Sequence, residues 1–148
     1  MQIKTRAVAE GDRDQWEVLY QGYAAFYKTE QSAEMRARVW DWLFDPGHEV
    51  EGLVAEGADG RLVGLAHYRA FARPLAAATG GFLDDLFVDP QARGSGAAAA
   101  LIDGVKAEGE KRGWSVVRWI TAEDNYRARG LYDRVAEQTR WVTYDIKL

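Results

Sequence analysis

The segment 83–101 constrains the fold of this chain more than any other stretch, because it joins a strand, a glycine-rich turn and the beginning of a helix. Residues 83–88 are mostly apolar and favour a strand, which Asp89-Pro90 ends because proline has no amide hydrogen for the ladder. The turn Gly94-Ser95-Gly96 lets the backbone approach a ligand closely, and the alanines at 97–100 favour a helix that begins at the second glycine. The first amides of a helix have no partner within it and carry the positive end of its dipole, so this turn is predicted to bind a phosphate group.

Two kinds of phosphate-binding turn are compatible with these residues. Residues 94–99 satisfy the dinucleotide pattern G-x-G-x-x-G/A, which is weak evidence by itself. A dinucleotide fold places its glycines directly after the strand and needs several further βαβ units, whereas residues 89–93 intervene here and little more than one α/β unit follows. The position of the glycines and the short remaining chain therefore argue against a nicotinamide-dependent oxidoreductase.

The second kind of turn carries a resemblance to a known family. Gln91-Ala92-Arg93-Gly94-Ser95-Gly96 matches Q/R-x-x-G-x-G/A, the acetyl-CoA signature of the GNAT superfamily of N-acetyltransferases, which this segment resembles. The acidic pair Asp84-Asp85 on the preceding strand is similar to the same family motif, and Asn125, followed seven residues later by Tyr132, resembles a second one. The resemblance covers roughly 83–147 and points to the polyamine, histone and D-amino-acid acetyltransferase branches.

The resemblance implies a function and a set of binding residues. It implies acetyl transfer from acetyl-CoA to a primary amine by direct attack in a ternary complex, with a small polyamine, an amino acid or a lysine-type side chain as acceptor. The alternative is a non-catalytic acyl-CoA-binding or sensing module with the same fold. The residues implied in acetyl-CoA binding are Leu86, Phe87, Val88, Gln91, Arg93, Gly94, Ser95, Gly96, Ala97, Ala98, Asn125, Ala128 and Tyr132.

The resemblance also implies catalytic roles for Tyr132, Asp84 and Asp85. Tyr132 would protonate the coenzyme A thiolate as it leaves. Asp84 takes the position of the base, where the polyamine enzymes carry a glutamate, and its shorter side chain favours a water relay over direct proton abstraction. Asp85 takes a substrate-contacting position. Because side chains alternate along a strand, the two aspartates are expected on opposite faces of the sheet.

Composition narrows the class of protein further. The 148 residues, 47% of them hydrophobic, predict one domain over 1–148. No run approaches the ~20 apolar residues of a membrane span, so a cytoplasmic protein without a membrane partner is expected. Cysteine is absent and His48 and His67 lie far apart in sequence, so no metal site is expected. A net charge of −4 and a pI near 5.2 argue against nucleic acid and mildly favour a cationic partner. Because dimers are common in the resembled family, a homodimer is one expected assembly.

The periodicity of apolar residues, together with the resemblance, predicts an α/β (α+β) GNAT fold. It consists of a mixed, mostly antiparallel, twisted sheet of six to seven strands flanked by about four helices, with a central parallel strand pair. Strands are predicted at residues 3–8, 49–56, 62–72, 83–88, 114–122 and 140–148, and helices at 12–27, 32–44, 96–112 and 125–135.

Several local features carry predictions of their own. Asp12, with Gln15 three residues on, predicts a capping box at the start of the first helix. His67 is predicted to be a packed or half-exposed strand residue rather than a base, and residues 73–81 are predicted to be a flexible connection. The first helix carries an aromatic and apolar face that is predicted to pack in the core: Trp16, Leu19, Tyr20, Tyr23, Phe26 and Tyr27. In the resembled family the first helices cover the acceptor site, which implies a place in a substrate pocket for some of these rings.

Overall fold

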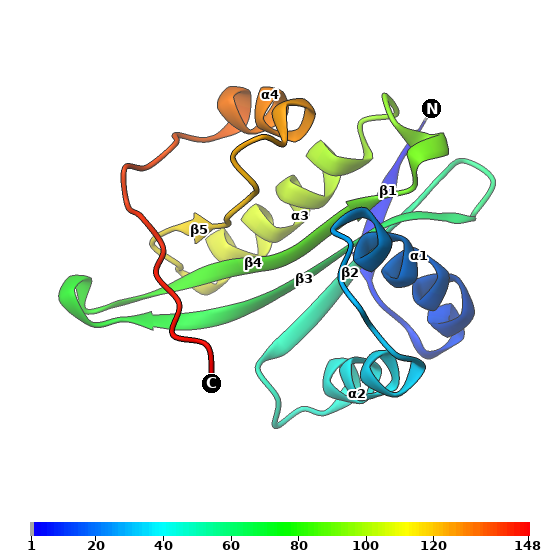
Figure 1. Cartoon of the computed structure of the whole chain (residues 1–148), viewed down its shortest axis with the longest axis horizontal. Coiled ribbons are helices and arrows are strands. Elements are labelled where there is room, and N and C mark those ends of the chain that lie inside the picture. The colour runs from blue at the N-terminus through cyan, green and yellow to red at the C-terminus, as the bar shows by residue number, and fades with distance from the viewer. Residues whose placement is uncertain (1) are drawn as a thin grey trace.

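The computed structural model describes residues 2–148, and its centre is a twisted sheet of five strands in the order β1-β2-β3-β4-β5 (Figure 1). The strands are β1 (Lys4–Ala7), β2 (Val50–Glu56), β3 (Leu62–Arg73), β4 (Ala78–Val88) and β5 (Val117–Arg118). Neighbouring strands pair antiparallel except β4 and β5, which pair parallel. The predicted mixed sheet with one parallel pair is therefore confirmed, but it has five strands and not six to seven.

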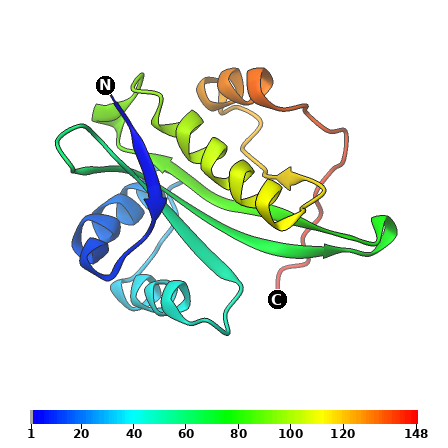
Figure 2. The ribbon, with the colours of Figure 1, turned by 180° about the vertical axis from the view of Figure 1, so that it is seen from behind.

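Helices cover both faces of this sheet. α1 (Arg13–Phe26) and α2 (Ala33–Phe44) pack on one face, whereas α3 (Ala97–Arg112) packs on the other and lies in front of the strands in Figure 2. α4 (Tyr126–Val135) follows β5 near the end of the chain. The helices predicted at 32–44 and 96–112 are confirmed to within one residue at each end. Ser32 caps α2 by accepting from the Met35 amide at 3.1 Å, and Gly113 ends α3 in the left-handed conformation.

Each face of the sheet carries its own hydrophobic cluster. β3 contributes to both clusters, because its side chains alternate between the two faces, and residues 62–68 are all buried. The cluster under α3 includes Ala66, Tyr68, Leu83, Leu101, Ile102 and Val105. The cluster under α1 and α2 includes Trp16, Leu19, Trp40, Val54, Leu65 and Phe87.

The predicted strand at 140–148 is wrong. Residues 137–148 form neither helix nor strand, and no strand of residues 2–148 pairs with them. An alternating sequence favours extended backbone, but a strand also needs a neighbour that supplies its hydrogen bonds. The apolar side chains of this segment are exposed, namely Trp141, Val142, Tyr144, Ile146 and Leu148.

The prediction of a flexible connection at 73–81 is also wrong. Residues 78–81 extend β4, and the turn between β3 and β4 is reduced to the short 3-10 helix Pro74–Ala76. Packing explains the glycine at 81, because a Cβ there would lie 2.3 Å from the Trp114 ring. Glycine therefore serves close approach of an aromatic ring here, and the segment is a regular part of the sheet.

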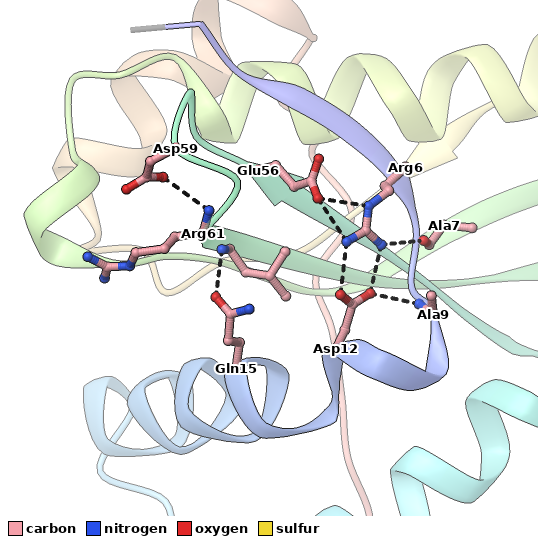
Figure 3. Close-up of polar contacts among 9 residues, drawn as sticks. Arg6, Ala7, Ala9, Asp12, Gln15, Glu56, Asp59 and Arg61 are labelled. Atoms are coloured by element: carbon pink, nitrogen blue, oxygen red, sulfur yellow. Dashed lines mark hydrogen bonds and ion pairs between the residues drawn. The ribbon is translucent and has the colours of Figure 1, made fainter.

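A buried carboxylate ties the beginning of α1 to the sheet (Figure 3). Arg6 on β1 donates to both oxygens of Asp12, at 2.7 and 2.8 Å, and it also donates to Glu56 on β2 at 3.0 Å. Asp12 accepts a further hydrogen bond from the Ala9 amide at 2.7 Å. The hydrogen bonds from Arg6 hold the pKa of Asp12 below its ordinary value.

The predicted capping box at Asp12 and Gln15 is wrong. Asp12 bonds no amide of α1, because its carboxylate is engaged by Arg6. Gln15 accepts instead from the amide of Leu62 at 2.9 Å, which links α1 to the beginning of β3 (Figure 3). Both side chains therefore anchor the helix to the sheet and not to its own first turn.

Replacing Asp12 with alanine is expected to lower the free energy of unfolding by about 2–4 kcal/mol, because Arg6 would lose its bidentate partner at a site that is largely buried. Urea denaturation measures this change. Glu110→Ala is the matched control, since it removes only the exposed pair with Lys106 at 3.8 Å and should cost at most about 0.5 kcal/mol. Equal losses in the two variants would contradict the anchoring role of Asp12.

Candidate active site

The glycine turn before α3 is open, and several of its amides have no protein partner. Gly94 and Gly96 have φ values of 81° and 85°, in the left-handed region that favours glycine, and nothing lies within 4 Å of where a Cβ would stand at either residue. Among the described residues, no acceptor meets the backbone amides of Gly94, Gly96, Ala98 and Ala99. These amides stand at the beginning of a helix, so the turn can bind an anionic group through backbone donors and the helix dipole.

The remaining predicted residues of the turn either hold its shape or surround it. The amide of Gln91 donates to the Asp89 carboxylate at 3.0 Å, and the Ser95 hydroxyl accepts from the Ala97 amide at 3.4 Å. The side chains of Gln91 and Arg93 are exposed. The guanidinium of Arg93 is therefore accessible to an anion bound at the turn, and its planar shape suits a phosphate.

β4 has a free edge that leads towards this turn. It pairs with β3 along its length but with β5 only through residues 81–82. From residue 83 to residue 88, its other edge pairs with no strand in the part of the chain that the structure describes. This edge includes Leu86, Phe87 and Val88, and its backbone can bond to the amides of an extended ligand as a further strand would.

A β-bulge lies at the two predicted aspartates. The register between β3 and β4 skips one residue at Asp84, so strict alternation, which predicts opposite faces for the aspartates, is interrupted there. Asp84 bonds to Arg69 and Asp85 bonds to His67. Arg69 and His67 lie two residues apart on β3, and both aspartates therefore meet side chains from one face of that strand.

Asp85 accepts hydrogen bonds from side chains in the core. Its Oδ2 accepts from the Tyr20 hydroxyl at 2.9 Å and lies 2.8 Å from Nδ1 of His67. Burial opposes the ionisation of this carboxyl group, but the interactions with His67 and Tyr20 outweigh it and lower the pKa of Asp85 below its ordinary value. Tyr23 lies near enough to act in the same direction, although its geometry falls outside that of a hydrogen bond. Burial and the charge of Asp85 raise the pKa of both tyrosines, so their hydroxyls stay protonated.

Asp84 has a different environment from its neighbour. It accepts from Nε of Arg69 at 3.1 Å, and 31% of its side chain is exposed. Burial nevertheless raises the pKa of Asp84, and the charge and hydrogen bond of Arg69 offset only part of this effect. Two adjacent carboxyl groups thus have pKa values shifted in opposite directions, a pattern typical of sites that carry out acid–base chemistry.

The beginning of α4 carries the first residue of the second predicted motif. Asn125 stands directly before this helix, and its side-chain amide donates to Oγ1 of Thr121 at 3.2 Å. This bond fixes the orientation of the Asn125 side chain, whose oxygen still has acceptor capacity for a ligand. Ala128 lies one turn further along α4 and is half-buried.

Tyr132 lies on the same helix and is half-buried. Its ring packs edge-on against Trp119, with centroids 5.4 Å apart. Burial, and secondarily the neighbouring Tyr27, raise the pKa of Tyr132 to about 12, so the hydroxyl is protonated at neutral pH and can act as an acid. No hydrogen bond or ring contact recorded between residues 2 and 148 joins Tyr132 to Asp84 or Asp85.

Sequence reasoning finds the two aspartates but misses the side chains that hold Asp85. Trp16 on α1 donates from Nε1 to Nε2 of His67 at 3.0 Å, and both residues are 1% exposed. The aromatic periodicity of α1 predicts that Trp16 is buried, and the position of His67 in a strand predicts that it is packed, both of which are confirmed. Neither pattern indicates that the two side chains meet, because 51 positions separate them.

The described residues contain neither a cluster of metal-ligating side chains nor a candidate membrane-spanning helix. Residues 2–148 contain no group of three or more histidine, aspartate or glutamate side chains placed to hold a metal ion. Over the same range, no helix is both long enough and apolar enough to cross a membrane.

Comparison with known proteins identifies the family. Residues 16–136 match the profile of the acetyltransferase (GNAT) family, well over half of the chain. The chain belongs to this family. The match includes the glycine turn, the two aspartates and α4, so the resemblance seen in the sequence is confirmed. As a GNAT acetyltransferase the chain is an enzyme of acetyl transfer, and its family uses acetyl-CoA as donor.

Individual relatives of this GNAT acetyltransferase act on different amines. It is 29% identical over 143 residues to the D-amino-acid N-acetyltransferase HPA3 of Saccharomyces cerevisiae, covering 96% of this chain and 89% of the relative. The ribosomal-protein-alanine N-acetyltransferase of Brucella melitensis biovar Abortus 2308 superposes over the whole of both chains with a TM-score of 0.82 and 25% identity. AAC(6')-Iy, solved with the bisubstrate analog CoA-S-monomethyl-acetylneamine, has a TM-score of 0.82 at 20% identity, over 100% of this chain and 99% of its own, and shares the fold.

Proposed function

We propose that this acetyltransferase transfers the acetyl group of acetyl-CoA to a primary amine, which attacks directly in a ternary complex. The observation that carries this proposal is the unpaired edge of β4 at residues 83–88, which leads to the open turn at 94–96. An extended donor with amides along its arm and a diphosphate at one end requires both features, a free strand edge and a cluster of unpaired amides.

Acetyl-CoA fits the residues that are present. The unpaired amides of Gly94, Gly96, Ala98 and Ala99, with the guanidinium of Arg93 nearby, suit its diphosphate in charge. The backbone of residues 86–88 would pair with its pantetheine arm, and Asn125 and Ala128 would contact the same arm from α4. When bound, the donor supplies a thioester carbonyl that a backbone amide can polarise.

Asp84 is the better candidate for removing a proton from the acceptor amine. An alkyl amine has a pKa near 10.4, so its deprotonation at pH 7 costs about 4–5 kcal/mol. Burial raises the pKa of Asp84, which brings its proton affinity closer to that of the amine, whereas the pKa of Asp85 is lowered. The short side chain of Asp84 favours a route through one water molecule.

Tyr132 is proposed as the acid of the reaction. The amine nitrogen forms a bond to the thioester carbonyl carbon, the carbon–sulfur bond breaks, and the sulfur keeps the electron pair. Tyr132 would give its phenolic proton to this sulfur and then regain a proton from solvent. The raised pKa of about 12 keeps that proton on Tyr132 before the carbon–sulfur bond breaks.

The acceptor is proposed to be a small amine or a basic side chain. Two adjacent carboxyl groups at the bulge favour a cationic molecule, because charge-assisted hydrogen bonds to ammonium groups are stronger than neutral ones. The relatives support an amino group as the site of transfer, since their names describe acetylation of D-amino acids and of alanine in a ribosomal protein.

An acetyl-transfer assay across several amines tests this function. Thiol release from acetyl-CoA is measured with spermidine, D- and L-amino acids, an aminoglycoside, a lysine-containing peptide and a peptide with N-terminal alanine. We expect turnover of at least one amine. Acceptors that bear a second positive charge should have a kcat/KM about tenfold higher than amino acids with a neutral side chain, as expected for one added charged hydrogen bond. Acetyl-CoA binding without turnover of any amine would favour the non-catalytic acyl-CoA-binding module.

A further inference from the structure

Three side chains form a hydrogen-bonded row from the core to the aspartate pair. Trp16 donates from Nε1 to Nε2 of His67 at 3.0 Å, and Nδ1 of His67 lies 2.8 Å from Oδ2 of Asp85. Trp16 and His67 are each 1% exposed, whereas the side chain of Asp85 is 20% exposed. The row therefore runs from a fully buried indole to a carboxylate that a ligand can reach.

The two hydrogen bonds of His67 together determine which of its nitrogens carries the proton. An indole nitrogen can only donate, so Nε2 of His67 must accept and cannot itself carry a proton while this bond exists. The single proton of the neutral ring then lies on Nδ1, from which it is donated to Asp85. Trp16 and Asp85 thus favour the same tautomer of His67, in which the imidazole accepts from the indole and donates to the carboxylate.

The imidazole ring is also held in place by its neighbours. The ring of Tyr20 meets it edge-on with centroids 4.7 Å apart, and the ring of Trp16 lies 5.8 Å away. Gly52 on β2 presents its backbone to the remaining side, where a Cβ would lie 3.6 Å from Cδ2 of His67. A flip of the imidazole would lose both hydrogen bonds inside a packed core, which costs far more than it would in water.

One oxygen of Asp85 remains for a ligand. Oδ2 accepts from both His67 and Tyr20, whereas Oδ1 takes part in no hydrogen bond recorded between residues 2 and 148. A carboxylate held by two donors at one oxygen has a single orientation, and its second oxygen is available to an ammonium group.

We propose that Trp16 and His67 are positioning residues, which orient Asp85 so that its Oδ1 binds the acceptor amine. This inference rests on the proposed acetyl transfer and assigns a different role to each of the two aspartates. Asp85 holds the acceptor as a fixed anion, and Asp84 is left to receive the proton. The pair Trp16 and His67 acts only through Asp85 and touches no reacting atom.

The two histidines of the chain provide a direct spectroscopic test in the unmodified protein. The amide of Val50 donates to Nδ1 of His48 at 3.1 Å, so His48 carries its proton on Nε2 when neutral. His67 carries its proton on Nδ1, and long-range proton–nitrogen NMR spectra should therefore show two histidines of opposite tautomer at pH 7.5. In Trp16→Phe, Nε2 of His67 loses its donor while Nδ1 still donates to Asp85, so the Nε2 signal should shift whereas the Nδ1 proton of His67 and the His48 signals are retained. Identical tautomers in the unmodified protein, or an unchanged Nε2 signal of His67 in the variant, would overturn the proposal.

Substitutions at His67 separate positioning from packing. His67→Asn keeps an amide donor towards Asp85, whereas His67→Leu fills the space with an apolar group and has no donor. We expect kcat/KM for the amine to fall roughly tenfold or more in His67→Leu and in Trp16→Phe, the effect typical of losing a group that orients a ligand-binding side chain. His67→Asn should retain more activity than His67→Leu, although a buried amide is less favourable for stability.

The outcomes distinguish this inference from the function on which it rests. Thermal unfolding ranks the variants by stability, and acetyl-CoA binding should be unchanged in all of them. If activity follows stability, so that His67→Leu equals or exceeds His67→Asn, the pair is a packing element and the proposal fails. If the unmodified protein turns over none of the amines, the proposed function fails, while the NMR result still tests the hydrogen-bonded row by itself.

Discussion

Replacing Tyr132 with phenylalanine is expected to lower kcat by about 10²–10⁴-fold, the contribution typical of a positioned general acid. The substitution removes one hydroxyl and keeps the ring that packs on Trp119, so the fold and the affinity for acetyl-CoA should be preserved. Steady-state kinetics, with a pre-steady-state check that chemistry limits the rate, measures the effect.

The same helix supplies a matched control for Tyr132. Tyr126 also lies on α4 but is 76% exposed, and Tyr126→Phe removes the same atom from a residue with no proposed role. Its kcat should stay within about twofold of the unmodified enzyme, since a solvent-exposed hydroxyl contributes little. If Tyr132→Phe retains full kcat, Tyr132 is a core residue and another group protonates the thiolate.

Replacing Gly94 with glutamate is expected to weaken acetyl-CoA binding by at least about 100-fold. The carboxylate would place a negative charge among the amides that are proposed to bind the diphosphate, and loss of one or two charge-assisted hydrogen bonds corresponds to about 3 kcal/mol. Calorimetric titration with acetyl-CoA measures the affinity directly and does not depend on knowing the acceptor.

Gly60 provides the control for this substitution, because its backbone matches that of Gly94. Both residues have left-handed φ values, 83° and 81°, and no atom lies within 4 Å of a Cβ at either position. Glutamate at each position therefore introduces similar backbone strain, but Gly60 lies in the turn between β2 and β3, away from the open turn before α3. If Gly60→Glu weakened binding as much as Gly94→Glu, the loss would reflect strain and not the proposed diphosphate site.

The proposed chemistry also explains why α1 cannot be treated as a helix of purely structural residues. Trp16 and Tyr20 belong to the hydrophobic cluster beneath α1 and α2, yet Trp16 donates to His67 within the row and Tyr20 donates to Asp85 at its end. Burial of these rings stabilises the fold, and the same burial removes water that would compete for their polar atoms. The stability of the fold and the orientation of the Asp85 carboxylate therefore depend on the same side chains.

Features that depend only on neighbours along the chain are predictable from the sequence. The glycine turn and the beginning of α3 were predictable, because left-handed φ values at Gly94 and Gly96 and the unpaired amides of a first helical turn are local properties. The end of α3 at Gly113 follows from the same kind of rule. The spacing of Asn125 and Tyr132 was readable because both lie within one short helical segment.

Features that depend on pairing between distant segments arise only when the chain has folded. The bulge at Asp84 arises from the register of β3 against β4, and the hydrogen bond between Trp16 and His67 joins residues 51 positions apart. Residues 140–148 have the alternation of a strand but no neighbouring strand in residues 2–148, so their pattern alone did not produce one. Local sequence fixes backbone preference, whereas hydrogen-bond partners, burial and the resulting pKa shifts exist only once the sheet and its helices have packed together.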